Sequence, residues 1–203
     1  MLKIGITGGI GSGKTTVSKI FEVLGIPVYY ADERAKVLMN TDEDIKHKIK
    51  ELFGSKSYDA TGNLNRKYLA SIVFNSKDKL QQLNDIVHPE VKRDFERWLK
   101  QHEGKEDYVM KEAALLFETG GDKELDYTIL VFAPEKLRID RVIKRDNVDE
   151  ESVLARMRNQ LDEDKKFDLA DLVILNDNEH LLIPQVLQLH RIFKELASRK
   201  RDA

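Results

Sequence analysis

The chain has 203 residues, of which 41% are hydrophobic and 34% are charged, a balance typical of a folded, water-soluble protein. Its formal net charge of −2 supplies no basic field, so we expect neither a nucleic acid nor a membrane surface as a partner. The chain contains no cysteine, which excludes a disulfide framework, thiolate catalysis and cysteine-ligated metal sites.

Short apolar runs with strand character alternate with segments of helical periodicity along the chain. The runs are Leu2–Thr7, Val28–Tyr30, Tyr108–Met110, Tyr127–Phe132 and Leu172–Leu175. The first is too short for the apolar core of a signal peptide or for a membrane span, so we expect a cytoplasmic protein. Strands that alternate with helices predict an α/β fold, here with five parallel strands covered by helices on both faces.

The interval between the second and third expected strands is much longer than a simple crossover requires. It carries helical patterns, for example Leu80, Leu83 and Val87. We therefore expect residues 33–105 to form a helical insertion at the carboxyl edge of the sheet, where ligands bind in open α/β folds. A second excursion over residues 135–167 is rich in Arg and Lys and lies between the fourth and fifth strands.

The segment Gly8–Thr15 reads GGIGSGKT and matches the phosphate-binding pattern G-x-x-x-x-G-K-[ST] between an expected strand and an expected helix. Its glycines let backbone N–H groups turn toward a phosphate, and the helix N-terminus adds the positive end of its dipole. Lys14 is expected to reach the β- and γ-phosphates, and Thr15 to place its hydroxyl on Mg²⁺. This context disfavours a ligand-free glycine turn. The predicted nucleotide contacts are Gly9, Gly11, Ser12, Gly13, Lys14, Thr15 and Thr16.

Regulatory GTPases carry the same loop, but the guanine-reading pattern Asn-Lys-x-Asp does not occur in this sequence. The one D-x-x-G match, Asp59–Gly62, lies in the inserted region rather than after a core strand. The pattern therefore favours an enzyme over a GTPase switch. Asp32 follows the second strand at the edge that faces the γ-phosphate, so its carboxylate could accept the proton of an attacking hydroxyl. An N-cap for a helix over residues 33–39 is the alternative, and position alone does not decide between them.

Several further segments resemble the dephospho-CoA kinase family in order and spacing from end to end of the chain. Beside the phosphate loop they are Ala31–Asp32, Gly62–Arg66, Ile72–Phe74, Leu83–Asn84, His88–Val91, Leu115–Glu118, Arg145–Asp146, Gln160 and Ala170–Asn176. The resemblance implies a nucleoside-monophosphate-kinase-like, phosphate-loop core over residues 1–32, 106–134 and 168–203. It also implies a helical substrate domain over residues 33–105 and a mobile lid over residues 135–167.

The resemblance implies transfer of the γ-phosphoryl group of ATP, with Mg²⁺, to the ribose 3′-hydroxyl of dephospho-CoA, which gives coenzyme A and ADP in the last step of coenzyme A biosynthesis. In this family the acid at Asp32 is the proposed base, and Asn176 stands where the adenine is held. The substrate contacts implied with Asp32 are Arg66, His88, Glu112, Leu115 and Phe117. Nothing in the sequence decides whether the protein self-associates.

The chain departs from the family at two places. Tyr30 replaces the first acid of Asp-Ala-Asp, and Ala114 replaces the proline before Leu115, which removes a fixed φ from a substrate-facing turn. Glu112, which ends the third strand, either orients a metal-bound water or is a helix-start charge.

Three further positions have two interpretations each. The pair His88-Pro89 indicates a helix boundary with Pro89 at the first helical position, and His88 could also bind the acceptor. Arg66 could bind substrate phosphates or solvate a helix start. Asn176 could be a loop asparagine that tolerates an unusual backbone.

Arg138, Arg141 and Arg145 share one helical face by their spacing. They form either a solvated face paired with Asp140 and Asp146 or a set of lid cations that neutralises the transition state. We favour Arg141 and Arg145 as catalytic, with Arg156 and Lys165–Lys166 as further candidates. A kinase for another small molecule, such as a nucleoside monophosphate, and a nucleotide-gated binding module are the competing functions.

Overall fold

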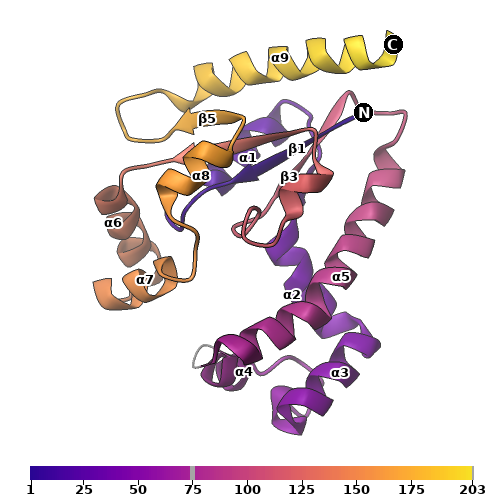
Figure 1. Ribbon diagram of the computed structural model, residues 1–203, viewed down its shortest axis with the longest axis vertical. Helices are drawn as coiled ribbons and strands as arrows, with labels where there is room; N and C mark the ends of the chain where they lie inside the picture. The colour runs from indigo at the N-terminus through magenta and orange to yellow at the C-terminus, as the bar shows by residue number, and fades with distance from the viewer. Residues whose placement is uncertain (74–75, 203) are drawn as a thin grey trace. The chain divides into compact units, whose positions relative to one another are not determined.

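The computed structural model describes residues 1–73 and 76–202. Phe74, the last residue of the segment Ile72–Phe74, lies outside the described residues. The chain divides into two compact units (Figure 1). Residues 1–30 and 102–203 form the first unit, and residues 31–101 form the second. The expected lid over residues 135–167 falls within the first unit, and its role as a lid stays a prediction.

The first unit is built on a five-stranded, all-parallel sheet in the order β2-β3-β1-β4-β5. The strands are β1 (Leu2–Thr7), β2 (Val28–Tyr30), β3 (Tyr108–Glu112), β4 (Tyr127–Phe132) and β5 (Leu172–Leu175). The predicted sheet is thereby confirmed, and β3 continues past the apolar run Tyr108–Met110 to Glu112, the residue expected to end it. Because β1 is central, the loop that follows it lies at the middle of the carboxyl edge of the sheet.

One face of the sheet packs against α1 (Lys14–Val23) and α9 (Leu182–Asp202), as Figure 1 shows. Ile4 and Ile6 of β1 are fully buried there against Phe21 and Phe193. Full burial of each such side chain stabilises the fold by about 1.5–3 kcal/mol. On the opposite face, a Cβ at Gly5 would lie 2.6 Å from Leu125, so the segment after β3 covers the centre of β1 closely.

Residues 135–169 form α6 (Glu135–Asp146), α7 (Glu150–Met157) and α8 (Glu163–Leu169). The side chain of Asp149 accepts from Ser152 N–H to cap α7, and Asp162 accepts from Asp164 N–H to cap α8. An apolar cluster of Ile139, Val142 and Val153 joins α6 to α7, and Ile10 of the phosphate loop packs against it. The excursion is therefore folded and is attached to the loop.

The second unit is helical, as expected for the insertion. Its elements are α2 (Ala31–Thr41), α3 (Glu43–Phe53), the short 3₁₀ helix η1 (Ser55–Ser57), α4 (Arg66–Val73) and α5 (Lys77–His102), whose last residue belongs to the first unit. Ile45, Ile49 and Phe95 are buried in its core. Arg34 of α2 donates two hydrogen bonds of 2.8 Å to the carboxylate of Asp94 on α5, and this bidentate pair joins the two helices.

Two expectations in this unit are wrong. Pro89 does not start a helix, because α5 runs through it from Lys77 to His102. An internal proline costs about 3 kcal/mol. Burial of Ile86 and Val87 before it, and of Val91 and Phe95 after it, offsets that cost. Asp32 is not an N-cap, because α2 already begins at Ala31 and places Asp32 in its first turn.

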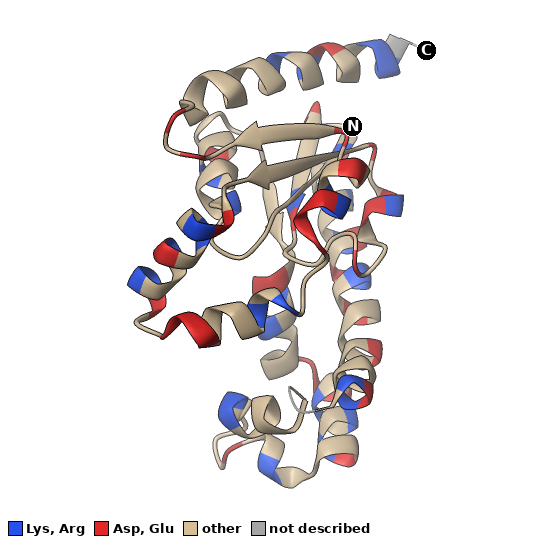
Figure 2. Ribbon diagram, turned by 60° about the vertical axis from the view of Figure 1, so that its left-hand side comes forward, with Lys and Arg blue, Asp and Glu red and all other residues tan. Residues whose placement is uncertain are grey.

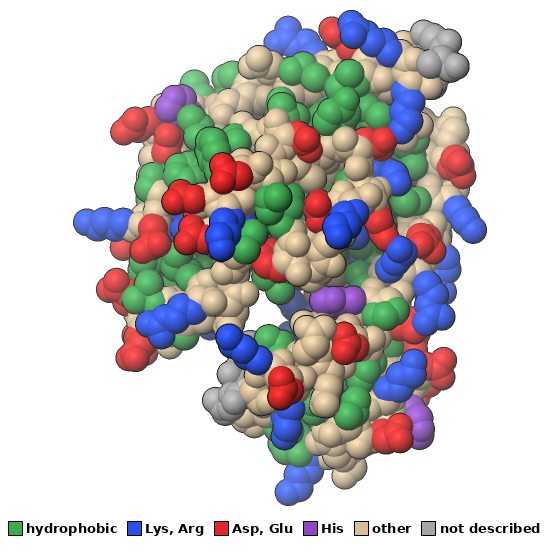
Figure 3. Space-filling view, viewed as in Figure 1, with side chains coloured by type: hydrophobic (Ala, Val, Ile, Leu, Met, Phe, Trp, Pro, Cys, Tyr) green, Lys and Arg blue, Asp and Glu red, His purple; other side chains and the backbone are tan. Residues whose placement is uncertain are grey.

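The surface carries mixed charge. In the ribbon of Figure 2, acidic residues mark the start of helices such as α7 and basic residues mark the end of α9, which suits the helix dipole. Basic and acidic side chains are interspersed over the face seen in Figure 3. Among the helices within residues 1–73 and 76–202, none has the length and apolar character that crossing a membrane requires.

Candidate nucleotide-binding site

The phosphate loop joins β1 to α1 through a turn that needs glycine at specific positions. Gly11 and Gly13 have φ values of +81° and +90°, a conformation that side chains rarely adopt. A Cβ at Gly13 would also lie 2.2 Å from the amide nitrogen of Asn176. Gly13 precedes α1 without a side-chain cap, so the first-turn N–H groups of α1 have no side-chain acceptor at the cap. This geometry suits a bound phosphate.

Thr15 and Glu112 meet at the carboxyl edge of the sheet. The hydroxyl of Thr15 donates a 3.1 Å hydrogen bond to Oε2 of Glu112, which is 7% exposed at the end of β3. They come together because β3 pairs with β1, the strand that precedes the loop. Hard oxygen donors of this kind suit Mg²⁺, which binds one or two protein groups together with phosphate oxygens and water. The residues present therefore fit the metal that the sequence predicts.

Asn176 is placed against the loop by β5. Its Nδ2 donates to the carbonyl oxygen of Ser12 at 2.7 Å, and its Oδ1 accepts from Arg141 at 3.4 Å. Arg141 also donates to Oδ1 of Asn178 at 2.8 Å. The left-handed asparagine of this turn is Asn178, with φ 72°, so the unusual-backbone interpretation does not apply to Asn176.

Arg145 and Arg141 have different hydrogen-bond partners. Its guanidinium donates to both carboxylate oxygens of Asp146, at 2.7 and 3.1 Å, and Arg156 donates to the same carboxylate at 2.8 Å. The hydrogen bond from Arg145, opposed by slight burial, holds the pKa of Asp146 below its usual range. The expected pairing of this face with Asp146 is present, and the geometry separates Arg145 from the contacts that Arg141 makes.

Gln160 links three segments that are far apart in the sequence. Its Oε1 accepts from Ile10 N–H in the phosphate loop at 2.8 Å, and its Nε2 donates to the carbonyl oxygen of Ala114 at 3.4 Å. The segment after β3, which includes Leu115 and Phe117, turns back through a hydrogen bond from Thr119 N–H to Leu115 O at 3.2 Å. The sequence places Gln160 in a family segment but carries no local signal for these contacts.

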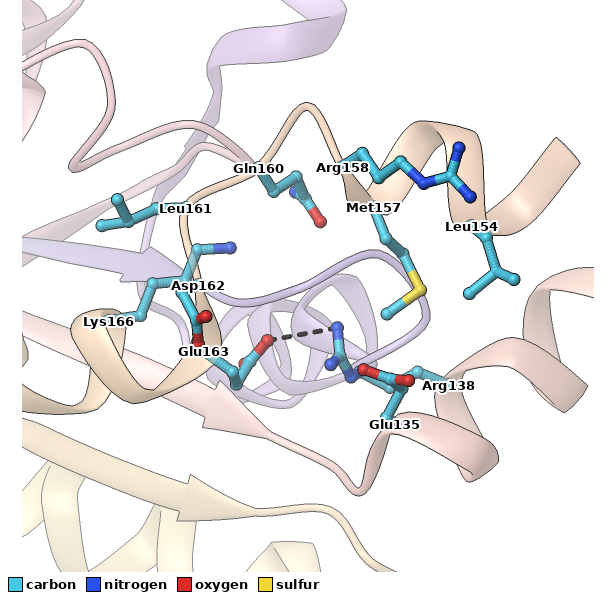
Figure 4. A pocket seen from close by; sticks show the side chains of 10 residues that line it. All are labelled: Glu135, Arg138, Leu154, Met157, Arg158, Gln160, Leu161, Asp162, Glu163 and Lys166. Atoms are coloured by element: carbon cyan, nitrogen blue, oxygen red, sulfur yellow. Dashed lines mark ion pairs between the residues drawn. The ribbon is translucent and has the colours of Figure 1, made fainter. Parts of the chain in front are cut away.

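A cluster of charged side chains lies beside the loop, and three of its members, Arg138, Glu163 and Lys166, line a cavity of about 400 Å³ (Figure 4). Arg138 forms an ion pair with Glu163 at 3.1 Å, and Lys166 lies 3.6 Å from Glu118. Burial lowers the pKa of Lys166, partly offset by the charges of Glu118 and Glu163. Arg138 is 5% exposed, so the solvated-face interpretation is wrong for this residue. Glu118 belongs to the family-like segment Leu115–Glu118, but no sequence signal marks Glu163, because no short motif marks a cluster drawn from three segments.

The remaining predicted residues belong to the second unit. Asp32 lies in the first turn of α2, Arg66 is the first residue of α4, and His88 lies inside α5. Each therefore comes from a different helix. Their roles toward a substrate stay predictions.

The sequence is similar to a known protein family over most of its length. A model of the dephospho-CoA kinase family matches residues 2–181. A dephospho-CoA kinase of Bacteroides fragilis is 42% identical over 188 residues, which cover 93% of this chain and 91% of the relative. A dephospho-CoA kinase of Salinibacter ruber is 45% identical over 179 residues, which cover 87% of this chain and 89% of the relative.

Solved structures agree with this result. A Thermus thermophilus protein of known crystal structure superposes with a TM-score of 0.83 at 36% identity, covering 94% of this chain and 96% of that protein. A dephospho-CoA kinase from Campylobacter jejuni superposes with a TM-score of 0.71 at 25% identity, covering 95% of this chain and 97% of that enzyme.

Proposed function

Because the chain belongs to the dephospho-CoA kinase family, we propose that it transfers the γ-phosphoryl group of Mg-ATP to the ribose 3′-hydroxyl of dephospho-CoA. The products are coenzyme A and ADP. The observation that carries this proposal is the phosphate loop of the first unit, whose Thr15 hydroxyl is hydrogen-bonded to Glu112. The cytoplasmic location expected from the sequence stays a prediction.

The phosphate loop is the proposed donor site. Glycine positions let the loop wrap the phosphates, with the N–H groups of Lys14, Thr15 and Thr16 at the start of α1. The ammonium of Lys14 would bind the β- and γ-phosphates. Thr15 would hold Mg²⁺ directly and Glu112 would orient one of its water ligands. When bound, the metal neutralises negative charge that develops on the transferred group.

Asn176 is the proposed contact with the adenine, and Arg141, which donates to it, is proposed as a lid cation that neutralises charge in the transition state. Asn176 is fixed by Ser12 O and by Arg141, so its amide is oriented before the nucleotide binds. The Arg141 guanidinium also lies 3.5 Å from the carbonyl oxygen of Gly11. To bind a phosphate of the nucleotide, the Arg145 guanidinium would have to release the carboxylate of Asp146.

Asp32 is the proposed base of the acceptor site. A carboxylate that holds the 3′-hydroxyl in line with the γ-phosphate increases the rate mostly by positioning the hydroxyl. It accepts the proton of the hydroxyl late, because the transition state is loose. Arg66 and His88 are proposed to bind the acceptor, together with Glu112, Leu115 and Phe117. Tyr30 supplies no carboxylate where the family has one, so Asp32 acts here without that neighbouring acid.

The proposal is tested by a mass-resolved assay with Mg-ATP and dephospho-CoA, run beside a panel of nucleoside monophosphates. We expect dephospho-CoA to gain one phosphoryl group at its 3′ position, with ADP formed in equal amount. Phosphorylation of a nucleoside monophosphate instead would favour the other small-molecule kinase. Nucleotide binding without acceptor-dependent ADP formation would favour a nucleotide-gated binding module.

A further inference from the structure

Gly9 differs from the other glycines of the phosphate loop in what requires it. Its φ lies outside the left-handed range, so the backbone would accept alanine. A Cβ at this position would nevertheless lie 2.1 Å from Nη1 of Arg138 and 2.7 Å from Oε2 of Glu163. By contrast, a Cβ at Gly11 would meet the carbonyl oxygen of Arg138 at 2.4 Å, and Gly11 has φ +81°. Side chains thus exclude a Cβ at position 9, and backbone excludes it at position 11.

Arg138 is held in one place by its own contacts. Its Nε donates to the carbonyl oxygen of Ala133 at 3.0 Å, and its Nη1 pairs with Glu163. The side chains of Arg138 and Glu163 are only 6% and 15% exposed. Figure 4 shows the two groups facing each other, with Arg138 on α6 and Glu163 at the start of α8. The pair therefore joins both helices at a point directly beside Gly9.

Stability alone is a weak reason for such a pair. Buried ion pairs are often no more stabilising than apolar side chains of the same volume, because both charges lose water. Within residues 1–73 and 76–202, Oε1 of Glu163 and Nζ of Lys166 are buried and find no hydrogen-bond partner, which adds to the cost. What the pair provides is fixed geometry, since a planar guanidinium held at Ala133 and Glu163 has little freedom to move.

We infer that Arg138 and Glu163 are positioning residues that brace residues 9–11 of the phosphate loop, and that residue 9 is glycine because of them. The inference rests on the proposed function only for its effect on turnover. The brace contacts the strand-side half of the loop, whereas Lys14 and Thr15 lie in the other half, at the start of α1. Loss of the brace therefore affects alignment of the transferred group more than binding of ADP, which depends chiefly on the helix-side half.

The decisive experiment is a double-mutant cycle between Gly9→Ala and Arg138→Gln, with turnover, ADP affinity and amide exchange of residues 9–11 measured for each variant. Gly9→Ala alone should lower kcat about 100-fold, as expected when alignment is lost by about 1 Å. Arg138→Gln alone should lower kcat about 10-fold and speed exchange of the Ile10 amide. ADP affinity should change less than about 3-fold in both, which separates loss of alignment from loss of folding.

The double variant should turn over within about 2-fold of Arg138→Gln alone, because the shorter side chain removes the clash with Nη1 and releases the Glu163 carboxylate from its ion pair, so that it can move away from the new Cβ. Gly11→Ala serves as the matched control, since its clash is with the backbone of residue 138 and Arg138→Gln cannot relieve it. If Arg138→Gln does not fold, Arg138→Lys gives the same test, because it removes Nη1 and keeps the charge. If the loss of kcat in the double variant is the sum, in free energy, of the losses in the two single variants, the inference is wrong.

Failure of the proposed function would look different. The same cycle can be measured in amide exchange alone, which needs no acceptor. If the wild-type chain does not phosphorylate dephospho-CoA but residue 9 and residue 138 still couple in exchange, the brace stands and the substrate assignment falls. If phosphorylation is normal and no coupling is found in either measurement, the brace falls and the function stands.

Discussion

The two units differ in how their candidate residues are assembled. In the first unit they are joined by direct contacts: Thr15 to Glu112, Asn176 to Ser12 and Gln160 to Ile10. In the second unit Asp32 and His88 lie on separate helices, α2 and α5, which the Arg34–Asp94 pair joins.

This difference explains which kind of binding site can be recognised from a sequence. A phosphate is bound largely by consecutive backbone N–H groups, so its site is a continuous stretch that a short motif can mark. The acceptor site proposed above draws side chains from several helices and from the segment after β3, which no local pattern groups together. Changes at Lys14, Glu112 and Asp32 separate nucleotide and metal binding from use of the acceptor. Changes at Asp94 and Asp126 compare the stability of the two units.

The largest effect is expected for Lys14→Ala. Loss of the ammonium that binds the β- and γ-phosphates should abolish measurable transfer and nucleotide binding, because no backbone group can replace that charge. Calorimetric titration with ATP checks the binding, with Lys19→Ala on the same helix as the matched control. Retained ATP affinity in Lys14→Ala would contradict the assignment of the donor site.

Glu112→Gln should act on the metal rather than on the nucleotide. Groups that orient a metal-bound ligand typically change metal affinity about 10–100-fold when altered. We expect the Mg²⁺ concentration for half-maximal turnover to rise at least about 10-fold. Metal-free ADP binding should be unchanged. A normal Mg²⁺ dependence would indicate that Glu112 is only a charge at the end of β3.

Asp94→Asn should destabilise the second unit. Its carboxylate accepts both bonds from Arg34, and hydrogen bonds to charged groups contribute about 1.5–3 kcal/mol to stability. Denaturant unfolding should show a loss of about that size, with faster amide exchange in α2 and α5. Glu90→Gln, which breaks an ion pair with the exposed Arg93, is the control and should cost about 0.5 kcal/mol or less. Equal losses in the two variants would contradict a special role for the Arg34–Asp94 pair.

The smallest effect concerns Asp126 in the first unit. Partial burial opposes ionisation, but hydrogen bonds from Lys200 and from Lys3 N–H prevail and hold the pKa of Asp126 below 3.8. Its contribution to stability is therefore present above pH 3.8 and is lost as pH falls through the folded-state pKa. Because water screens the pair, we expect only about 0.5–1 kcal/mol. Asp126→Asn should lower Tm slightly at pH 7, and it should make the fall of Tm at acid pH less steep than in the wild-type chain. An unchanged acid side of the curve of Tm against pH would exclude this contribution.

The sequence predicted the sheet well, because β-branched and aromatic runs bounded by glycine or proline are strong local signals. It failed at Pro89, where burial of apolar residues on both sides outweighs the local cost of proline. It also predicted Arg138, by its spacing, to share a face with Arg145, yet Arg138 is buried and Arg145 is exposed. Spacing places residues on a helix, whereas burial depends on which segment packs against that helix.

Asp32→Asn shows whether Asp32 acts on the acceptor while the first unit binds the nucleotide. Turnover with dephospho-CoA and the dissociation constant of ATP should be measured on the same preparation. We expect kcat to fall about 10²–10⁴-fold, the usual contribution of a general base, with ATP affinity unchanged. Turnover equal to that of the wild-type chain, or an equal loss of ATP affinity, would contradict this role of Asp32.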